Sequence, residues 1–236
     1  MKAHPVKIFF LLVILPVVLF AQANGKDFGL SLNLNYTTTS QLYLQPNSPD
    51  PVIRNTSQSL DKISSYSAEL RYQYSESILF GISSEYIKKT FDNTMNLGGT
   101  AAKVTDGYKV IPVELSIYYQ LPFSTELFKF FMGGGMGFYI GEQIREVGDV
   151  TVSNSSRKIG YGIQVSIGMD YLVNSFIAIR GQMRFREPDF EMKSTYSNKI
   201  VNYDDRTFLL PTQSFDSKVI IDGITFTIGA VLNFGL

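Results

Sequence analysis

The sequence contains no cysteine and no tryptophan, and its only histidine is His4. Without cysteine there is no disulfide framework, no thiolate zinc site and no lipidated cysteine. Charged residues make up 18% of the chain and their formal sum is zero, which gives no electrostatic basis for binding nucleic acid. Composition therefore excludes nucleic acid as a partner and leaves few candidate catalytic side chains.

Sequence motifs for nucleotide binding and hydrolysis are missing too. The run Gly133–Phe138 begins like a dinucleotide fingerprint, but Phe138 stands where the third glycine belongs and no helix pattern follows. There is no phosphate-binding G-x-x-x-x-G-K-[ST] loop and no G-x-S-x-G elbow. We therefore expect a non-enzymatic protein with no cofactor and no metal site.

The first 23 residues have the anatomy of a secretory signal peptide. Lys2 and Lys7 supply a basic start, Ile8–Phe20 is an unbroken apolar run, and Ala21-Gln22-Ala23 is an A-x-A cleavage site. The run falls short of the roughly 20 apolar residues that a membrane-spanning helix needs. Cleavage would remove His4 and two lysines, and with them any catalysis through histidine. We expect residues 1–23 to be the signal and 24–236 to form one domain.

The mature chain alternates between apolar and polar residues in eight separate runs, which is the period of a strand with two unlike faces. The sixth run is the cleanest, because apolar residues from Ile159 to Tyr171 alternate with Gly160, Gly162, Gln164 and other polar or small residues. The eight runs cover residues 28–37, 65–74, 78–86, 111–120, 130–140, 159–171, 177–185 and 223–234.

Alternation alone also fits a soluble sandwich or a lipocalin-like barrel, but the placement of aromatic residues favours a membrane barrel. Rings gather at both ends of the apolar faces, as they do at the two interfaces of a bilayer. One girdle would hold Phe28, Tyr74, Phe80, Tyr119, Phe130, Tyr171 and Phe234. The other would hold Tyr36, Tyr66, Tyr86, Phe138, Tyr161 and Phe185.

The connections between the runs alternate between short and long. The short connections are Ser75–Ser77, Pro122–Lys129 and Val173–Ser175. The long polar ones are Thr39–Lys62, Phe91–Gly107, Glu142–Arg157 and Glu187–Ser217. This is the pattern of outer-membrane barrels. The sequence therefore predicts an all-β fold, an eight-stranded antiparallel transmembrane β-barrel with short periplasmic turns and long extracellular loops.

Two runs resemble strands of known small outer-membrane proteins. Ile111–Pro122, which has a proline near its start and Tyr118-Tyr119 near its end, resembles the fourth strand of porin-like barrels, and Phe131–Tyr139 resembles their following glycine-rich strand. The families are the OmpW-like, OmpX-like and OmpA-barrel proteins of Gram-negative bacteria. OmpW-like proteins imply passage of small hydrophobic molecules, and OmpX-like proteins imply adhesion or defence at the surface. The chain departs from both in lacking tryptophan and in ending Phe234-Gly235-Leu236.

The polar positions, which alternate with the apolar ones along each strand, include charged residues that would face the lumen. We expect a polar network there, and its members are Glu69, Arg71, Glu85, Glu114, Asp170, Arg180 and Arg184, with Arg186 at the rim. Isolated charges in a narrow barrel are costly, so opposite charges on neighbouring strands should pair and plug it. The alternatives are a polar conduit and a catalytic carboxylate pair formed by Glu85 and Glu114.

Two functions stay open at this point. One is a structural or surface-interaction role for a plugged barrel, and the other is a narrow or laterally open channel for small, including hydrophobic, molecules. Expected partners are the lipid and lipopolysaccharide of the bacterial outer membrane, and a ligand or partner at the long loops, where aromatic residues such as Tyr43, Tyr196, Tyr203 and Phe208 lie. We expect a monomer.

Overall fold

The computed structural model describes residues 28–210 and 214–235, and almost all of them lie in strands. The expected signal peptide, residues 1–23, and the chain end at Leu236 lie outside the described residues. The elements are β1 (Phe28–Tyr43), α2 (Pro51–Asn55), β2 (Ser57–Gln73), β3 (Ile78–Leu97), β4 (Thr100–Gln120), β5 (Phe128–Val147), β6 (Val150–Arg157), β7 (Gly160–Leu172), β8 (Ile177–Arg186), β9 (Asp189–Tyr196), β10 (Ile200–Tyr203), β11 (Arg206–Leu209), β12 (Ser214–Ile220) and β13 (Ile224–Phe234).

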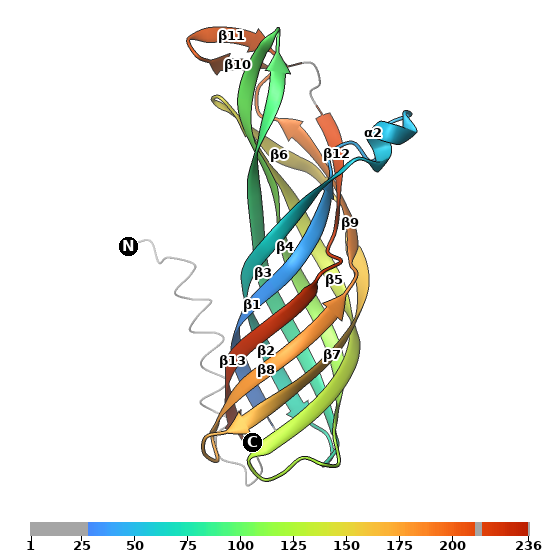
Figure 1. Ribbon diagram of the computed structural model, residues 1–236, viewed down its shortest axis with the longest axis vertical. Coiled ribbons are helices and arrows are strands. Elements are labelled where there is room, and N and C mark those ends of the chain that lie inside the picture. Colours follow the sequence, from blue (N-terminus) through green and yellow to red (C-terminus); the bar gives the residue numbers. More distant parts are fainter. Residues whose placement is uncertain (1–27, 211–213, 236) are drawn as a thin grey trace, which may run out of the picture.

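The antiparallel pairings return to the strand where they begin. β1 pairs with β2, and the ladder continues through β3, β4, β5, β7, β8 and β13. β13 then pairs with β1 over Phe28–Thr37, so each of these strands has a neighbour on both sides. The tilted strands form the elongated body in Figure 1. We call the end with the short turns β2–β3, β4–β5 and β7–β8 the inner end, and the opposite end the outer end.

The remaining long strands extend the same wall toward the outer end. β5 pairs with β6, β6 with β9, β9 with β12 and β12 with β1. Because β6 leads into β7, β8 into β9 and β12 into β13, three positions in the wall are each built from two strands. The all-β prediction is confirmed. The described residues form thirteen strands rather than eight, since three wall positions are divided and β10–β11 adds a hairpin.

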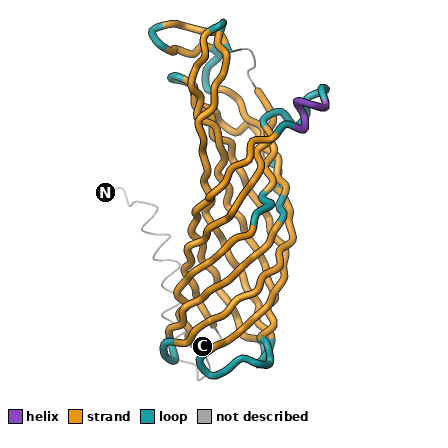
Figure 2. Tube along the Cα trace, viewed as in Figure 1, coloured by secondary structure: helices purple, strands orange, loops and turns teal. Residues whose placement is uncertain are grey.

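The three divisions lie close together. Pro188 separates β8 from β9 and cannot donate a backbone hydrogen bond to a neighbour. Opposite it, a Cβ on Gly162 would come within 2.8 Å of the Pro188 Cα, and one on Gly160 would come within 2.4 Å of the Phe190 Cβ. Only glycine lets the chains approach so closely. The interruption is visible as neighbouring loop segments at mid-height in Figure 2.

The four long connections were predicted to be loops, and that prediction is wrong for most of their residues, although residues 44–56 do form a loop that contains the short helix α2. Residues 91–107 form the ends of β3 and β4, which meet at Gly98 and Gly99 with φ of +55° and +92°. Residues 39–62, 142–157 and 187–217 likewise contain long stretches of strand. The alternation continues in these segments, but with the opposite sense: apolar side chains such as Leu42 and Val104 are buried at 0% and 1% exposure.

The wall therefore changes character along its length. Toward the inner end the apolar side chains point outward; Leu32 is 66% exposed and Ile163 is 75% exposed. In the outer extension, apolar side chains pack inside in two clusters. The first contains Leu42, Leu60, Ile63, Ile87, Tyr108, Val110, Tyr139, Phe190, Met192, Val219 and Ile221. The second contains Leu97, Ala102, Val104, Val147, Val150, Tyr196, Val201 and Leu210.

Aromatic residues lie at both ends of the outward-facing apolar zone. Near the outer end of the zone Tyr66 is in register with Tyr86, and the Phe138 and Tyr161 rings meet edge to face at 5.6 Å. Near the inner end the Phe28 ring stacks on that of Phe234 at 5.9 Å. These aromatic pairs lie at the ends predicted for the two girdles. The inner girdle also includes the ring of Tyr72, which contacts Phe28 and was not predicted from the sequence.

The outermost part is tied together by polar contacts. Asn202 in β10 donates from its backbone N–H and its side-chain amide to the Asp149 carboxylate, at 2.8 and 2.7 Å. These hydrogen bonds hold the pKa of Asp149 below its usual value. The one helix in the described residues, α2, has five residues and projects from the outer end (Figure 1), and no described helix has the length and apolar character needed to cross a bilayer.

The outward apolar face predicts which substitutions the wall tolerates. Val165 in β7 is 56% exposed and apolar, so Val165→Arg should destabilise membrane-inserted protein by about 2–4 kcal/mol, the cost of an arginine on the lipid face at mid-membrane. The measurement is reversible unfolding in lipid vesicles.

Two controls accompany this variant. Thr151→Arg places the same side chain on the exposed surface of the outer extension, and Ser166→Ala changes the next residue, which faces the lumen. Both should cost much less than Val165→Arg. Equal losses at Val165 and Thr151 would mean that the apolar face does not contact lipid.

Candidate functional site

The interior of the barrel holds charged side chains, all of them almost completely buried except Asp170, which is 16% exposed. Glu69 and Arg71 come from β2, Glu85 from β3, Glu114 from β4, Asp170 from β7, and Arg180, Arg184 and Arg186 from β8. All lie at the alternate positions of their strands whose side chains face inward, so the alternation in the sequence is sufficient to place them in the lumen. The four carboxylates and four arginines add to zero charge.

The inner cluster is centred on Arg180, which is 2% exposed. Its Nε and Nη2 donate to the two oxygens of Asp170 at 2.7 and 2.8 Å. Its Nη1 donates to Glu69 Oε2 at 2.6 Å and to Ser31 Oγ at 3.2 Å. Since Asp170 and Arg180 are direct cross-strand partners on β7 and β8, this is the pairing that strand adjacency favours.

Arg71 completes the inner cluster. Its Nε donates to Glu69 Oε2 at 2.9 Å, and its guanidinium lies 3.7 Å from the centre of the Tyr118 ring and 4.2 Å from that of Phe131. The Tyr118 hydroxyl donates to Glu69 Oε1 at 2.5 Å. A Cβ on Gly133 would come within 2.3 Å of the Tyr118 ring, so the glycine-rich strand β5 leaves room for this ring.

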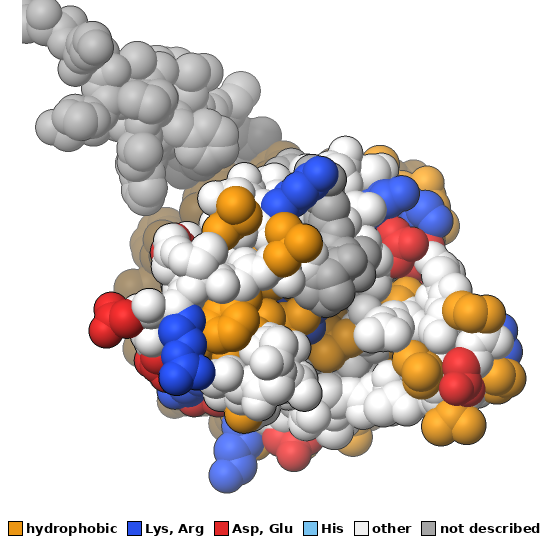
Figure 3. Space-filling model, turned by 90° about the horizontal axis from the view of Figure 1, so that it is seen from above, with side chains coloured by type: hydrophobic (Ala, Val, Ile, Leu, Met, Phe, Trp, Pro, Cys, Tyr) orange, Lys and Arg blue, Asp and Glu red, His pale blue; other side chains and the backbone are white. Residues whose placement is uncertain are grey.

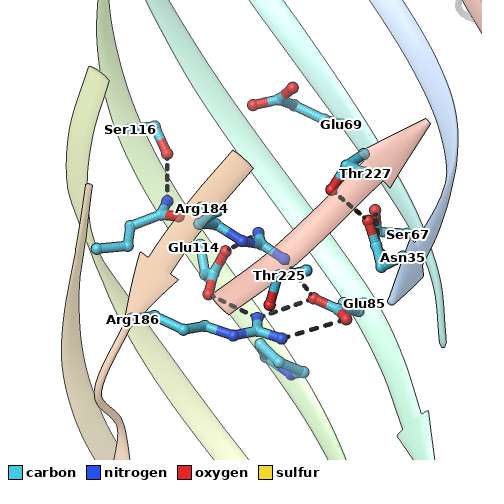
Figure 4. Close-up of polar contacts among 12 residues, drawn as sticks. Asn35, Ser67, Glu69, Glu85, Glu114, Ser116, Arg184, Arg186, Thr225 and Thr227 are labelled. Carbon is cyan, nitrogen blue, oxygen red and sulfur yellow. Dashed lines mark hydrogen bonds and ion pairs between the residues drawn. The ribbon is translucent and has the colours of Figure 1, made fainter. Parts of the chain in front are cut away.

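The outer cluster contains two arginines and two glutamates. Arg184 donates from Nη1 to Glu114 at 2.6 Å and from Nη2 to Glu85 at 2.7 Å. Arg186 reaches Glu85 at 2.8 and 3.2 Å and Glu114 at 3.2 Å. The four side chains come from β3, β4 and β8 and point toward one another in Figure 4. Tyr139 donates to Glu114 at 2.6 Å, and Ser65 donates to Glu85.

The structure brings all seven of the predicted network residues together, in these two clusters. Arg186 was predicted at the rim, and that prediction is wrong, because its side chain is 0% exposed and contacts both glutamates. The sequence reading also missed Tyr118 and Tyr139. Tyr118 lies on β4 next to the glycine-rich strand β5, and Tyr139 lies on β5 itself. Both are at inward-facing positions, and the space that the glycines leave was the available signal.

The geometry of Glu85 and Glu114 bears on the catalytic alternative. Both carboxylates are shared by Arg184 and Arg186, and each accepts a further hydroxyl hydrogen bond. A general acid or base has to exchange a proton with substrate, but these oxygens are occupied by the protein itself. Within residues 28–210 and 214–235, no cluster of three or more acidic or histidine side chains has an arrangement suited to a metal ion.

Above the outer cluster the lumen is filled by apolar side chains, the first of the two clusters described above. The Tyr139 ring joins the two layers, since it stacks on Phe190 at 6.5 Å while its hydroxyl contacts Glu114. Viewed from the outer end, hydrophobic side chains lie between the polar and charged groups of the rim (Figure 3). Cavities of about 540 Å³ lie at the inner mouth, beside Arg71 and Asp170, and at the outer mouth, beside Asp106 and Arg145.

The inner cluster predicts a strong coupling between two residues. Arg180→Met removes the ion-pair partner of Asp170 and should lower the free energy of unfolding by about 3–5 kcal/mol, since breaking a buried pair leaves a charge poorly hydrated. Asp170→Asn in the Arg180→Met background should restore part of the loss in a double-mutant cycle. Chemical unfolding in lipid vesicles measures both effects.

Gln164→Met is the matched control, because Gln164 is also buried in the lumen but is neutral and donates one hydrogen bond, to Ser116. It should cost about 1 kcal/mol. If Arg180→Met cost no more than Gln164→Met, or if its effect and that of Asp170→Asn simply added, the two charges would not depend on each other.

The sequence matches no protein-family model and no curated protein, but the fold is similar to solved structures. The crystal structure of the outer membrane protein OprG from Pseudomonas aeruginosa superposes with a TM-score of 0.58 at 14% identity, covering 89% of this chain and 96% of that one. Neisserial surface protein A has a TM-score of 0.47 at 11% identity, over 88% and 97% of the two chains. The protein has the fold of small outer-membrane β-barrel proteins, as its resemblance to the porin-like strands predicted.

Proposed function

We propose that this chain is a non-enzymatic, monomeric β-barrel protein of the bacterial outer membrane whose lumen is closed and whose outer extension is displayed at the cell surface. The proposal depends mainly on how side chains fill the interior of the barrel. Two ion-pair clusters and an apolar layer occupy it in succession, and Arg186 at 0% and Glu114 at 1% exposure lie at its centre. Residues 1–23 act as the signal for export.

The outer wall supports membrane insertion. The apolar outward zone and its two aromatic ends match the lipid-facing band of a membrane barrel. Phe28 and Tyr36 mark the two ends on β1, a distance of nine residues, which a tilted strand needs to cross a bilayer. The sharp change from apolar to polar outward residues then marks the water interface.

Basic residues beyond the outer aromatic end support contact with lipopolysaccharide. Lys88 on β3 and Lys109 on β4 lie directly opposite each other, just past Tyr86. Two like charges in register destabilise a sheet, and Lys109 also bonds to Glu142 at 2.5 Å. Phosphate groups of neighbouring lipid would reduce the repulsion between the Lys88 and Lys109 ammonium groups.

The closed interior favours display over conduction. A solute crossing the lumen would have to separate Arg184 and Arg186 from their glutamates, and each buried pair costs about 3–5 kcal/mol to break. It would then meet the apolar layer around Ile87 and Val110. Neither layer offers the hydrated path that a porin provides.

A second candidate function rests on the divided wall. The wall is interrupted between β6 and β7, between β8 and β9, and between β12 and β13, at neighbouring places. One backbone hydrogen bond that joins the chains there runs from Ile221 N–H to Pro188 O, at 3.3 Å. A small molecule entering from outside could leave sideways there rather than cross the lumen. This would be a laterally open channel for small apolar molecules.

Recordings from single proteins in planar bilayers test the proposed function. The purified full chain, inserted into the bilayer, should give no steady ion current, because no continuous aqueous path crosses the two ion-pair clusters. Bilayers that receive detergent alone are the control. Steady channels that scale with protein added would contradict the closed lumen. A silent barrel that speeds entry of an apolar dye into vesicles would support the lateral route instead.

The orientation gives a separate prediction. An epitope tag inserted between Asp204 and Asp205, the exposed β10–β11 turn, should be accessible to antibody on intact cells, and a tag at Glu76 in the β2–β3 turn should not. Permeabilised cells should expose both. Staining of the Glu76 tag on intact cells would reverse the orientation.

A further inference from the structure

A cavity of about 540 Å³ lies at the outer mouth, separated from the lumen charges by the apolar layer. Its walls come from strands far apart in the sequence, and they include Leu44, Met95, Asp106, Arg145, Tyr196 and Phe215. Its volume falls in the range of pockets for small molecules. Apolar side chains and polar or charged side chains both line it, so a ligand there can pack against the former and form hydrogen bonds with the latter.

The polar part of the pocket is held rigidly. Arg145 donates to both oxygens of Asp106, from Nε at 2.5 Å and from Nη2 at 2.9 Å. Asn93 donates to Asp106 Oδ2 at 3.0 Å. Asp106 is 0% exposed and Arg145 is 15% exposed, so the carboxylate anchors the guanidinium from behind while the guanidinium reaches the cavity.

Two hydrogen-bonding groups of the pocket remain incompletely used. Arg145 Nη1 has one weak contact, at 3.5 Å, with the Tyr196 hydroxyl. That hydroxyl accepts in this contact, and among the residues that the structure describes no acceptor is in place for its own proton. Tyr196 is 5% exposed. Buried polar groups are normally satisfied, so these donors can bind a ligand that offers oxygen acceptors.

The charges of the wall limit the kind of ligand. Arg145 is neutralised by Asp106, and Asp216 adds a carboxylate that accepts a hydrogen bond from Asn47 at 3.0 Å. Asp216 is also the cross-strand partner of Lys193, so the charges of the wall balance and an anion would meet no surplus of positive charge. An organic cation would find the Phe215 ring already facing Arg145, whose guanidinium lies 4.9 Å from the ring centre. A neutral ligand that both donates and accepts hydrogen bonds fits both constraints.

We propose that the outer-mouth pocket binds a neutral saccharide of one or two sugar units. Sugar hydroxyls would accept from Arg145 and Tyr196 and donate to Asp216, while the C–H faces of the ring would lie against Met95, Leu44 and the partly exposed Phe215. The inference rests on the proposed function in one respect, because Leu44 in the pocket wall packs against the apolar layer that closes the lumen.

Calorimetric titration of the folded full chain in detergent tests the proposal. Glucose, maltose and the lipid-free core oligosaccharide of lipopolysaccharide are titrated separately, with glucose 6-sulfate as a charged comparator. At least one neutral sugar should bind, and the sulfated sugar should bind more weakly. Preference for the core oligosaccharide would identify neighbouring lipopolysaccharide as the source of the ligand, and preference for glucose or maltose a soluble one.

Three variants locate the site. Tyr196→Phe removes one hydroxyl and Asp216→Ala one carboxylate, and each should weaken binding about fivefold, the effect of one hydrogen bond. Phe215→Leu should weaken it by a similar factor. Tyr203→Phe and Phe123→Leu make the same chemical changes outside the pocket and should leave affinity unchanged. Circular dichroism of each variant confirms the fold.

Several results would overturn the proposal. They are the absence of binding by every neutral sugar in the panel, unchanged affinity in all three pocket variants, or tighter binding of the sulfated sugar. Bilayer recordings of the same protein keep the two proposals apart. A silent barrel that binds no sugar would contradict the saccharide site alone, and a conducting barrel that binds sugar would contradict the closed lumen alone.

Discussion

A carboxylate or guanidinium that leaves water for the interior of a narrow barrel loses several kcal/mol of hydration energy, and opposite charges in contact have to recover it. In this barrel eight such groups are arranged as two neutral clusters, and both depend on β8, which supplies Arg180, Arg184 and Arg186 at alternate or nearby inward positions. The register of β8 with β7 and β13 therefore has one favourable value. A shift by one residue would turn the arginines into lipid and leave Glu85 and Glu114 unpaired.

The same strands cross two environments, and the side-chain pattern changes where they do. On β3, Phe80, Ile82 and Tyr86 point outward, whereas Ile87 and Leu97 farther along point inward. In lipid the favourable exterior is apolar, and in water it is polar. Beyond the membrane the barrel thus becomes an ordinary soluble β-structure with an apolar core. This inversion places the apolar core of the extension directly above the ion pairs.

The sequence was sufficient to predict the strands of the membrane zone, because apolar residues alternate there without interruption, as from Ile159 to Tyr171. It was also sufficient to place Glu69, Arg71 and Arg180 inside, since alternate residues of a strand face opposite sides of the wall. It failed for the outer extension, where polar outward residues suggested loops. Adjacent apolar pairs such as Tyr86-Ile87 and Val110-Ile111 mark the inversion, but only when an extended strand is already assumed. Arg186 was misplaced because the depth of a residue in the barrel depends on strand register and tilt. Alternation along a strand shows only which face a residue is on.

Solvent exchange of the arginine side-chain protons measures directly whether the ion-pair layer is closed to water. The Nε–H groups of Arg180 and Arg186 would be followed by nuclear magnetic resonance in the detergent-solubilised protein, with the exposed Arg206 as internal reference. Both side chains are at most 2% exposed. Exchange at both positions should be slower than at Arg206 by orders of magnitude. Exchange at Arg186 as fast as at Arg206 would show that water fills the lumen and that the ion-pair layer is open.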